Sequence, residues 1–354
     1  MNKEKLINIA KNFKIDGEPT DIEICNSGHI NKTYAITYKT DNGDNKKYIL
    51  QYVNTNVFPN LPELMKNIKN VTNYMVKKAE ENDFEEISKL HIGSTITMID
   101  AIDDNPYAIY NKNWRMEEFI DNTKTYLTTE NLSILEEAGR AAGKFQRYLN
   151  GFPAEDLYEI IPKFHYTPNR VNQLKEALSS KENQTERKER FELAKDVIEF
   201  ATDEKRLNRT NIITDKLENK QIPLRVTHND TKLSNILFDK DTDKAVCLID
   251  LDTVMPGALA YDFGEGLRTG ITTAKEDEQD LSKIKIDINR FEAYAKGFLN
   301  EFVLKDFYII YKREIHLIYK DDILLQKEDE IAARCSFNRR SEKLYFYSDM
   351  SINI

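Results

Sequence analysis

The chain has 354 residues and a net charge of −9, with 40% hydrophobic and 31% charged residues and an isoelectric point of about 5.3. This composition is typical of a soluble globular protein, and the length favours two lobes or domains over a single core. The acidic balance argues against nucleic acid as the main partner, although a bound nucleotide needs only a local positive site.

The cysteines and the hydropathy pattern indicate the cellular setting. Cys25, Cys247 and Cys335 are few and widely spaced, and they match neither a disulfide framework nor a zinc motif, so we expect a reducing cytoplasm. The opening MNKEKLINIAKNFKI lacks the apolar run of a signal peptide. No stretch approaches the roughly 20 apolar residues of a membrane helix, so we expect no membrane association.

The first third of the chain is predicted to be rich in sheet. Helical spacing predicts a short amphipathic helix over residues 3–13. Alternation in IEIC, TYAITY and YILQYV predicts three strands, with Asn42-Gly43 as a strong hairpin signal. A helical stripe runs from Leu61 to Met75, and ITMI, YAIY and WRMEEFI predict further strands. Residues 1–120 are therefore expected to form a small N-lobe with one main helix.

The remainder is predicted to be mostly helical. Helical patterns cover residues 129–149, the charged region 171–218 and residues 287–300, and short strands occur in LRVTH, NILF and AVCLID. We therefore predict an α+β, protein-kinase-like two-lobe fold, with a larger C-lobe over residues 121–354.

The stretch VTHNDTKLSNILFD is too rich in polar residues for a simple turn between strands. It contains the spacing D-x-K-x-x-N of the protein kinase catalytic loop as Asp230, Lys232 and Asn235, and Asp250 and Asp252 follow in KAVCLIDLD. Phosphoryl transfer needs a carboxylate to accept the proton of the attacking hydroxyl, oxygen ligands for Mg2+ and a cation for the phosphoryl group. The pattern therefore favours a kinase.

The alternative interpretation is an ordinary polar loop. Against it, a carboxylate at the end of the hydrophobic strand before Asp250 would be costly without a partner or a metal. His228 is different, because a His before such a loop is more often a structural hydrogen-bonding residue than a catalyst.

These residues resemble the aminoglycoside phosphotransferase and choline kinase superfamily, small-molecule kinases with a protein-kinase-like fold. Within it the sequence is most similar to N-acetylhexosamine 1-kinases. The matching segments span most of residues 22–300 and are NSGHINKTY, YILQYVNTNVFP, WRMEEFI, LRVTHNDTKLSNILFD, CLIDLDTVMPGALAYDFGEGLR and DLSKIKIDINRFEAYAKGF. The resemblance implies that ATP and Mg2+ are used to phosphorylate the anomeric hydroxyl of N-acetylglucosamine or N-acetylgalactosamine.

The resemblance also implies roles for the catalytic residues. Asp230 would be the general base that meets the substrate hydroxyl, and Lys232 would contact a phosphate. Asn235 and Asp250 would be Mg2+ ligands, and Asp252 is a weaker ligand candidate. Asp262, within YDFG, is expected to brace the catalytic loop from below.

Further positions are expected to bind the nucleotide. Gly28 lies in the turn Asn26-Ser27-Gly28-His29, whose backbone amides would cover the phosphates. The backbone around Glu118 and Ile120 would recognise the adenine base. Gln51 stands where a kinase carries its phosphate-binding Lys, which leaves the phosphate contacts open.

The sugar is expected to contact His29, Arg268 and Thr269, near Asp230. The C-terminus departs from the family pattern, because no Arg-Phe-Leu-x-Asp-Tyr type segment follows residue 303. RCSFNRRSEKLYFYSDMSINI shows no sustained period of 2 or 3.6. We expect this tail to be the least native-like part and to leave the sugar site incompletely covered; a divergent tail that still packs is the alternative.

Two competing functions stay open from the sequence. One is a kinase of another small alcohol, such as an aminoglycoside, choline or homoserine. The other is an inactive pseudokinase, for which the tail argues and the intact Asp230, Lys232, Asn235 and Asp250 set argues against. The expected partners are ATP and a small sugar, and the sequence leaves the oligomeric state open.

Overall fold

The structure is a computed structural model that describes residues 2–25, 30–82, 95–180, 184–274, 278, 283–302, 332–338 and 343–349. The chain divides into two compact units, Met1–Ile160 with Arg225–Lys305, and Ile161–Leu224 with Asp306–Ile354. Every candidate site residue that the structure describes belongs to the first unit. The lobe boundary at residue 120 stays a prediction.

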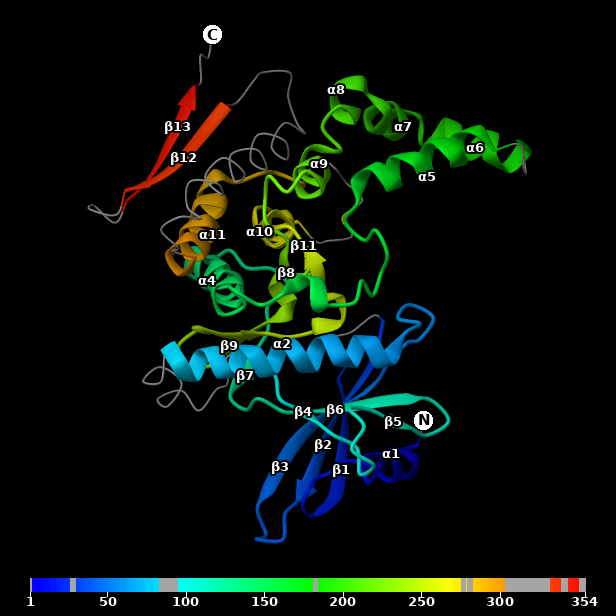
Figure 1. Ribbon diagram of the computed structural model, residues 1–354, viewed down its shortest axis with the longest axis vertical. Helices are drawn as coiled ribbons and strands as arrows, with labels where there is room; N and C mark the ends of the chain where they lie inside the picture. Colours follow the sequence, from blue (N-terminus) through cyan, green and yellow to red (C-terminus); the bar gives the residue numbers. More distant parts are fainter. Residues whose placement is uncertain are drawn as a thin grey trace. The chain divides into compact units, whose positions relative to one another are not determined.

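An antiparallel sheet dominates the N-terminal part of the first unit (Figure 1). Its main path runs in the order β1-β2-β3-β6-β4, and β5 pairs with β6. The strands are β1 (Glu18–Cys25), β2 (Lys32–Lys39), β3 (Asn45–Tyr52), β4 (Met98–Ile99), β5 (Ala108–Ile109) and β6 (Asn113–Glu118). The predicted turn at Asn42-Gly43 joins β2 to β3, and the positive φ of 87° at Gly43 is one that glycine adopts without strain.

Helix α1 (Lys3–Ala10) packs its apolar side on one face of this sheet. Leu6, Ile9 and Ala10 join a buried cluster with side chains of β2, β3 and β6, and the Tyr38 hydroxyl donates to the Ala10 carbonyl at 2.8 Å. Because side chains alternate along a strand, the opposite face carries the intervening residues of β2, β3 and β6. That opposite face becomes part of the candidate site.

The C-terminal part of the first unit is built on helices. Helix α2 (Leu61–Asn82) precedes it, and α4 (Leu132–Tyr148), α10 (Leu259–Gly270) and α11 (Ile288–Glu301) form its core. Helices α4 and α11 approach so closely that a Cβ on Gly139 would lie 2.0 Å from the Tyr294 carbonyl oxygen. Short strands carry the polar loops: β7 (Thr123–Lys124), β8 (Arg225–Thr227), β9 (Ile236–Asp239), β10 (Ala245–Leu248) and β11 (Met255–Gly257).

The second unit contains short helices and a hairpin. The helices are α5 (Thr167–Ser179), α6 (Gln184–Leu193), α7 (Lys195–Thr202), α8 (Glu204–Leu207) and α9 (Ile212–Glu218). Strands β12 (Ala332–Asn338) and β13 (Lys343–Asp349) pair antiparallel. The periodicity of the tail did not predict these strands. Residues 303–331, 339–342 and 350–354 lie outside the described residues, so the expectation of a poorly packed tail stays a prediction.

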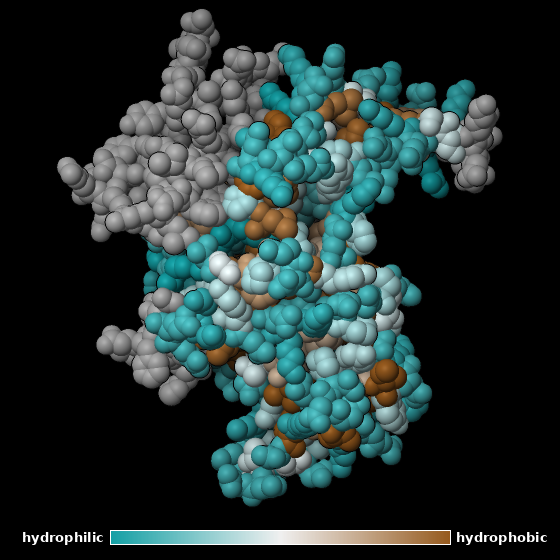
Figure 2. Space-filling view, viewed as in Figure 1, coloured by the Kyte–Doolittle hydropathy of each residue, from teal (hydrophilic) through white to brown (hydrophobic). Residues whose placement is uncertain are grey.

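The α+β, protein-kinase-like prediction is confirmed by the antiparallel N-terminal sheet and the helical C-terminal part. Helix α10 and strands β7 and β11 were not predicted from periodicity, because each is short or follows a polar loop. Figure 2 shows a largely hydrophilic face over the described residues, with apolar side chains scattered across it. Within the described ranges, no helix is long and apolar enough to cross a membrane.

Candidate active site

The loop between β8 and β9 brings the three residues of the predicted catalytic motif together. The Asn235 side-chain amide donates to Asp230 Oδ2 at 2.7 Å and to the Asp230 carbonyl at 3.0 Å. Lys232 Nζ lies 3.0 Å from the same Oδ2 atom. Asp230 Oδ1 takes part in none of the hydrogen bonds of the described residues. One carboxylate oxygen is therefore fixed, and the other can meet a ligand.

Asp262, at the start of α10, holds this loop from below. Its carboxylate accepts from the backbone amides of His228 at 3.0 Å and Asn229 at 2.7 Å, and from Gln146 Nε2 at 2.7 Å. Burial raises the pKa of Asp262, while His228 and these donors act in the opposite direction. Thr231 Oγ1 donates to the Asp262 carbonyl. These contacts confirm the expectation that Asp262 braces the loop.

His228 and its neighbours tie the loop to the segment after β10. His228 is fully buried and its Nε2 lies 3.0 Å from the Ile249 carbonyl oxygen, which confirms a structural hydrogen-bonding role. Asn229 has a positive φ of 65°, and its side-chain amide donates to the Thr253 carbonyl at 2.8 Å. Thr253 Oγ1 in turn donates to the His228 carbonyl. The two segments therefore form one hydrogen-bonded body.

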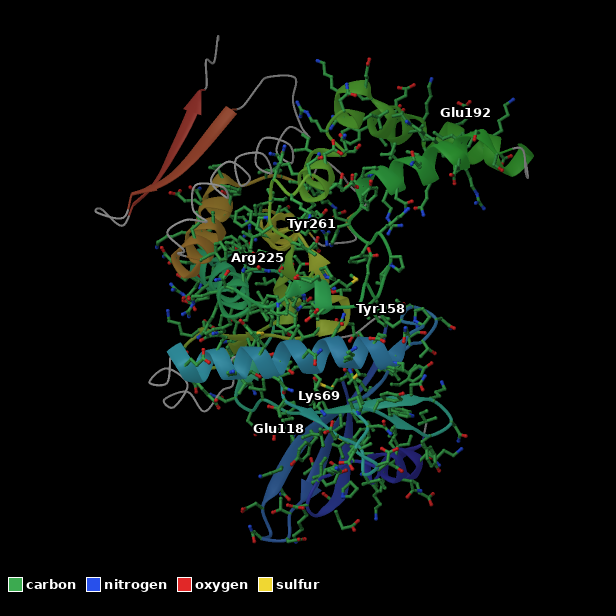
Figure 3. The ribbon with its side chains drawn as sticks, viewed as in Figure 1. Lys69, Glu118, Tyr158, Glu192, Arg225 and Tyr261 are labelled. Carbon is green, nitrogen blue, oxygen red and sulfur yellow. The ribbon has the colours of Figure 1, made fainter. Side chains whose placement is uncertain are left out.

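Arg225, at the start of β8, anchors the same body to helix α4 (Figure 3). Its guanidinium donates to both the side-chain and the backbone oxygens of Gln146, at 3.0 and 2.6 Å, and to Asn150 Oδ1 at 3.0 Å. Sequence reasoning did not single out Arg225, although an Arg at the start of the apolar stretch LRVT was a usable signal.

Asp250 directly follows strand β10 in the left-handed conformation, with φ 62° and ψ 60°. Its side chain forms no hydrogen bond or ion pair with a described residue. Asp250 keeps an exposed surface, yet desolvation of its carboxylate by the surrounding protein and the neighbouring Asp252 raise its pKa to about 7, against the opposing effect of Arg115. An unpaired carboxylate in a strained turn between acidic neighbours is suited to a cation.

The residues present fit a Mg2+ ion for which the protein would supply only part of the ligand shell. Because Asn235 uses its amide hydrogens on Asp230, its Oδ1 is the atom left for a ligand. Among the described residues, no three His, Cys, Asp or Glu side chains are grouped as in an all-protein metal site. Mg2+ is usually bound by one or two carboxylates, with substrate phosphates and water completing the shell.

Asp252 lies in a different environment from Asp250. Its side chain is 3% exposed, forms an ion pair with Arg115 and accepts from Asn31 Nδ2 at 2.6 Å. Both carboxylate oxygens are thus occupied by donors, one from β6 and one from the residue that precedes β2. Its role as a weaker metal ligand stays a prediction.

Arg115 is the main site residue that sequence reasoning missed. It lies on β6 directly opposite Gln51 of β3, and its Nε donates to Gln51 Oε1 at 2.8 Å. Gln51 Nε2 in turn donates to Thr33 Oγ1 at 3.1 Å. Burial lowers the pKa of Arg115, but Asp252 and Glu117 outweigh this effect and raise it. A basic residue between two apolar ones in WRM was the available signal.

The structure describes only some of the positions predicted to bind the nucleotide and the sugar. Gly28 and His29 lie outside the described residues. Glu118 is exposed at the end of β6 and its amide donates to the Thr97 carbonyl, while the Ile120 carbonyl accepts from Thr123 (Figure 3).

Arg268 and Thr269 lie on α10. Arg268 is exposed and forms a bidentate ion pair with Glu265, and Thr269 Oγ1 lies 3.4 Å from the Glu265 carbonyl oxygen. The nucleotide and sugar roles of all these positions stay predictions.

Comparison with known proteins places this site in context. The sequence pattern of the phosphotransferase enzyme family matches residues 104–295, just over half of the chain. Solved structures similar to this one include spectinomycin phosphotransferase in complex with ADP and spectinomycin, at 13% identity over 93% of this chain and 91% of that chain, with a TM-score of 0.51. Choline kinase from Cryptosporidium parvum Iowa II shows 15% identity over 92% and 87%, also with a TM-score of 0.51.

A third similar structure is the amicoumacin kinase hAmiN in complex with AMP-PNP, Ca2+ and Ami. It is 14% identical and the match covers 93% of this chain and 87% of that chain, with a TM-score of 0.50. At these identities the three structures support the fold alone.

Proposed function

The chain belongs to the phosphotransferase enzyme family, and from this premise we propose that it is an ATP- and Mg2+-dependent kinase of N-acetylhexosamines. The proposed reaction transfers the γ-phosphoryl group of ATP to the anomeric hydroxyl and releases ADP and a hexosamine 1-phosphate. The observation that carries the kinase part is the gathering of Lys232 and Asn235 on Asp230, with the unpaired Asp250 following strand β10.

Asp230 is proposed to act as the general base. Asn235 and Lys232 fix its Oδ2, so Oδ1 is the oxygen available to the substrate hydroxyl. As the oxygen–phosphorus bond forms, the hydroxyl proton passes to this carboxylate and the bond to the β-phosphate oxygen breaks. Fixing one oxygen restricts the rotation of the carboxylate, and this favours a productive geometry.

Asp250 and Asn235 Oδ1 are the proposed Mg2+ ligands. The ion would supply positive charge that neutralises the phosphate oxygens and orients them. A complex of a structurally similar kinase contains AMP-PNP and Ca2+, which is compatible with a nucleotide and a divalent cation here. Binding of a cation would also lower the raised pKa of Asp250.

Lys232 and Arg115 are the proposed positive groups for the phosphates. Gln51 supplies no charge at the usual lysine position, but Arg115 lies beside it on the next strand. The guanidinium would therefore supply the missing positive charge on the same face of the sheet, as a buried group that it shares with Asp252. The ion pair with Asp252 holds the Arg115 guanidinium in one orientation.

The proposal of a neutral N-acetylhexosamine rests on the sequence segments VTHNDTKLSN, DLDTVMPG and GHINKTY, which together resemble N-acetylhexosamine 1-kinases. The structurally similar kinases carry other substrate names, spectinomycin and choline among them. Those amino alcohols therefore belong in the same test as competing substrates.

The test is a substrate panel with purified protein, ATP and Mg2+, measuring ADP release. It includes N-acetylglucosamine, N-acetylgalactosamine, glucose, choline, homoserine and spectinomycin, with Asp230→Asn as the matched inactive control. We expect turnover of the N-acetylhexosamines, and phosphorus NMR should show the 1-phosphate. A 6-phosphate, or preferred turnover of an amino alcohol, would overturn the sugar proposal, and no turnover of any alcohol would overturn the kinase proposal.

A further inference from the structure

The N-terminal sheet carries a pocket on the face that α1 covers. Its volume is about 480 Å3, within the range of small-molecule sites. Three aromatic rings, Tyr34, Tyr52 and Trp114, form part of the wall, and Lys32 and Lys112 stand at its edge. We call this the α1 pocket.

The α1 pocket is positively charged. Lys5 of α1 also lines it, which makes three lysines, and no Asp or Glu is among the described residues that line it. None of the three lysines forms an ion pair with a described residue. In contrast, Lys3 and Lys11 of the same helical region pair with Asp21 and Glu18. Unpaired positive charges gathered in a hollow of a protein with a net charge of −9 attract anions.

The aromatic rings give the pocket a second chemical character. Trp114 packs between Tyr34 and Tyr52, with ring centroids 6.3 and 5.7 Å apart, and Lys112 Nζ lies 4.3 Å from the Tyr52 ring centroid. Tyr52 is only half-buried, and the neighbouring Tyr110 is 39% exposed. Trp114 and Tyr34 are buried, so Tyr52 and Tyr110 are the rings that a ligand can reach. Partly exposed rings next to ammonium groups suit a ligand that has both a ring and a negative charge.

The strand register separates this pocket from the candidate active site. Lys32 pairs with Tyr52, and Tyr52 pairs with Trp114, whereas the adjacent row holds Gln51 and Arg115. Because side chains alternate along a strand, the two rows point to opposite faces of the sheet. A ligand in the α1 pocket would therefore be distinct from one that contacts Arg115.

We propose that the α1 pocket binds a small phosphate ester that carries a ring, either a sugar phosphate or a nucleotide, with the phosphate at Lys32 and Lys112 and the ring against Tyr52. Binding in the α1 pocket does not depend on the proposed reaction, so failure of the kinase test would leave this proposal unchanged.

Trp114 provides the readout, because it is the single tryptophan of the chain and lines the pocket. Full-length Asp230→Asn protein, used to prevent turnover, is kept free of other nucleotides, because AMP-PNP is itself a ring-bearing phosphate ester that would also occupy the α1 pocket. It is then titrated with UMP, N-acetylglucosamine 1-phosphate, uridine and inorganic phosphate, while tryptophan fluorescence is recorded. We expect a saturable change with UMP or the sugar phosphate that weakens with added salt. Tighter binding of UMP would identify the ligand as a nucleotide, and tighter binding of N-acetylglucosamine 1-phosphate would identify it as a sugar phosphate.

Charge-reversal variants locate the site. Lys32→Glu and Lys112→Glu should each weaken binding by about fivefold or more, the effect of losing an exposed charge pair and gaining a repulsion. Lys39 lies on β2 with Lys32, and Lys46 lies on β3 with Tyr52, but neither lines the pocket, so Lys39→Glu and Lys46→Glu should leave binding unchanged. Tyr52→Leu should reduce the preference for ring-bearing esters over inorganic phosphate.

Three outcomes would overturn the proposal. One is no saturable change with any phosphate ester. The second is equal weakening by the pocket variants and by the Lys39 and Lys46 controls. The third is binding of inorganic phosphate as tight as that of the ring-bearing esters, which would leave only a simple anion site.

Discussion

Removal of Arg115 should reveal how much the ion pair with Asp252 stabilises the protein. Both side chains are 3% exposed, and Asp252 would keep only Asn31 as a donor in Arg115→Met. Leaving one member of a buried pair without its partner costs about 3–5 kcal/mol. Gln51 also loses the donor to its Oε1, which adds about 1 kcal/mol. We expect a loss of about 4–6 kcal/mol, or a melting temperature lower by about 8–12 °C.

The double variant Arg115→Met with Asp252→Leu distinguishes the cost of an unpaired buried charge from the cost of altered packing. Replacing both charges by apolar groups removes the unpaired carboxylate, so the double variant should lose only about 0–2 kcal/mol. Urea unfolding without nucleotide or metal measures Arg115→Met, Asp252→Leu and the double variant. Lys69→Met is the matched control, because the ion pair of Lys69 with Asp100 is partly exposed and should be worth less than about 1 kcal/mol (Figure 3).

The reasoning would be refuted if Arg115→Met unfolded within 1 kcal/mol of the Lys69→Met control, or if the double variant lost as much as the two single variants together. Either result would mean that Asp252 is not held by Arg115 in solution. Asp252 would then be free to act as a metal ligand.

Three further predictions concern the catalytic carboxylates. Asp230→Asn should keep its melting temperature and lose about 10²–10⁴ in kcat, as expected for loss of a general base; wild-type kcat would exclude Asp230 from this role. Asp250→Ala should raise the Mg2+ concentration needed for activity more than Asp252→Ala, because only Asp250 is unpaired, and a metal titration with equal shifts would contradict the assignment. The Asp250 pKa of about 7 exceeds its unfolded value of about 3.9, so protonation stabilises the folded metal-free protein and this stability is lost as pH rises towards 7. Asp250→Asn should therefore unfold at a higher temperature than the wild type at pH 8.5, where the stability difference is at most about 4 kcal/mol, or about 1–2 kcal/mol after allowance for solvent exposure. The difference should shrink as the pH falls and disappear below the unfolded pKa of about 3.9, and identical pH profiles would argue against a raised pKa.

Local sequence pattern encodes several of the strands and helices and the composition of the catalytic loop, but not helix α10 or strands β7, β11, β12 and β13. Alternation and helical spacing depend on neighbouring residues, so β1, β2, β3, α2 and α11 could be predicted from local pattern. The spacing of Asp230, Lys232 and Asn235 is also local, because all three lie within one loop that η2 (Leu233–Asn235) closes. Asp262 could be assigned as a brace only through family resemblance.

Tertiary structure alone decided the partners of the buried charges. Asp250 and Asp252 are two residues apart and look equivalent in the sequence, yet one is unpaired and the other is enclosed by Arg115 and Asn31. That difference depends on β6 and the start of β2, which are more than a hundred residues away in the chain. A carboxylate removed from water must find a donor wherever the fold supplies one, and no local pattern encodes which donor that is. The same long-range pairing placed Arg115 beside Gln51 and so positioned a positive charge that the motif itself lacks.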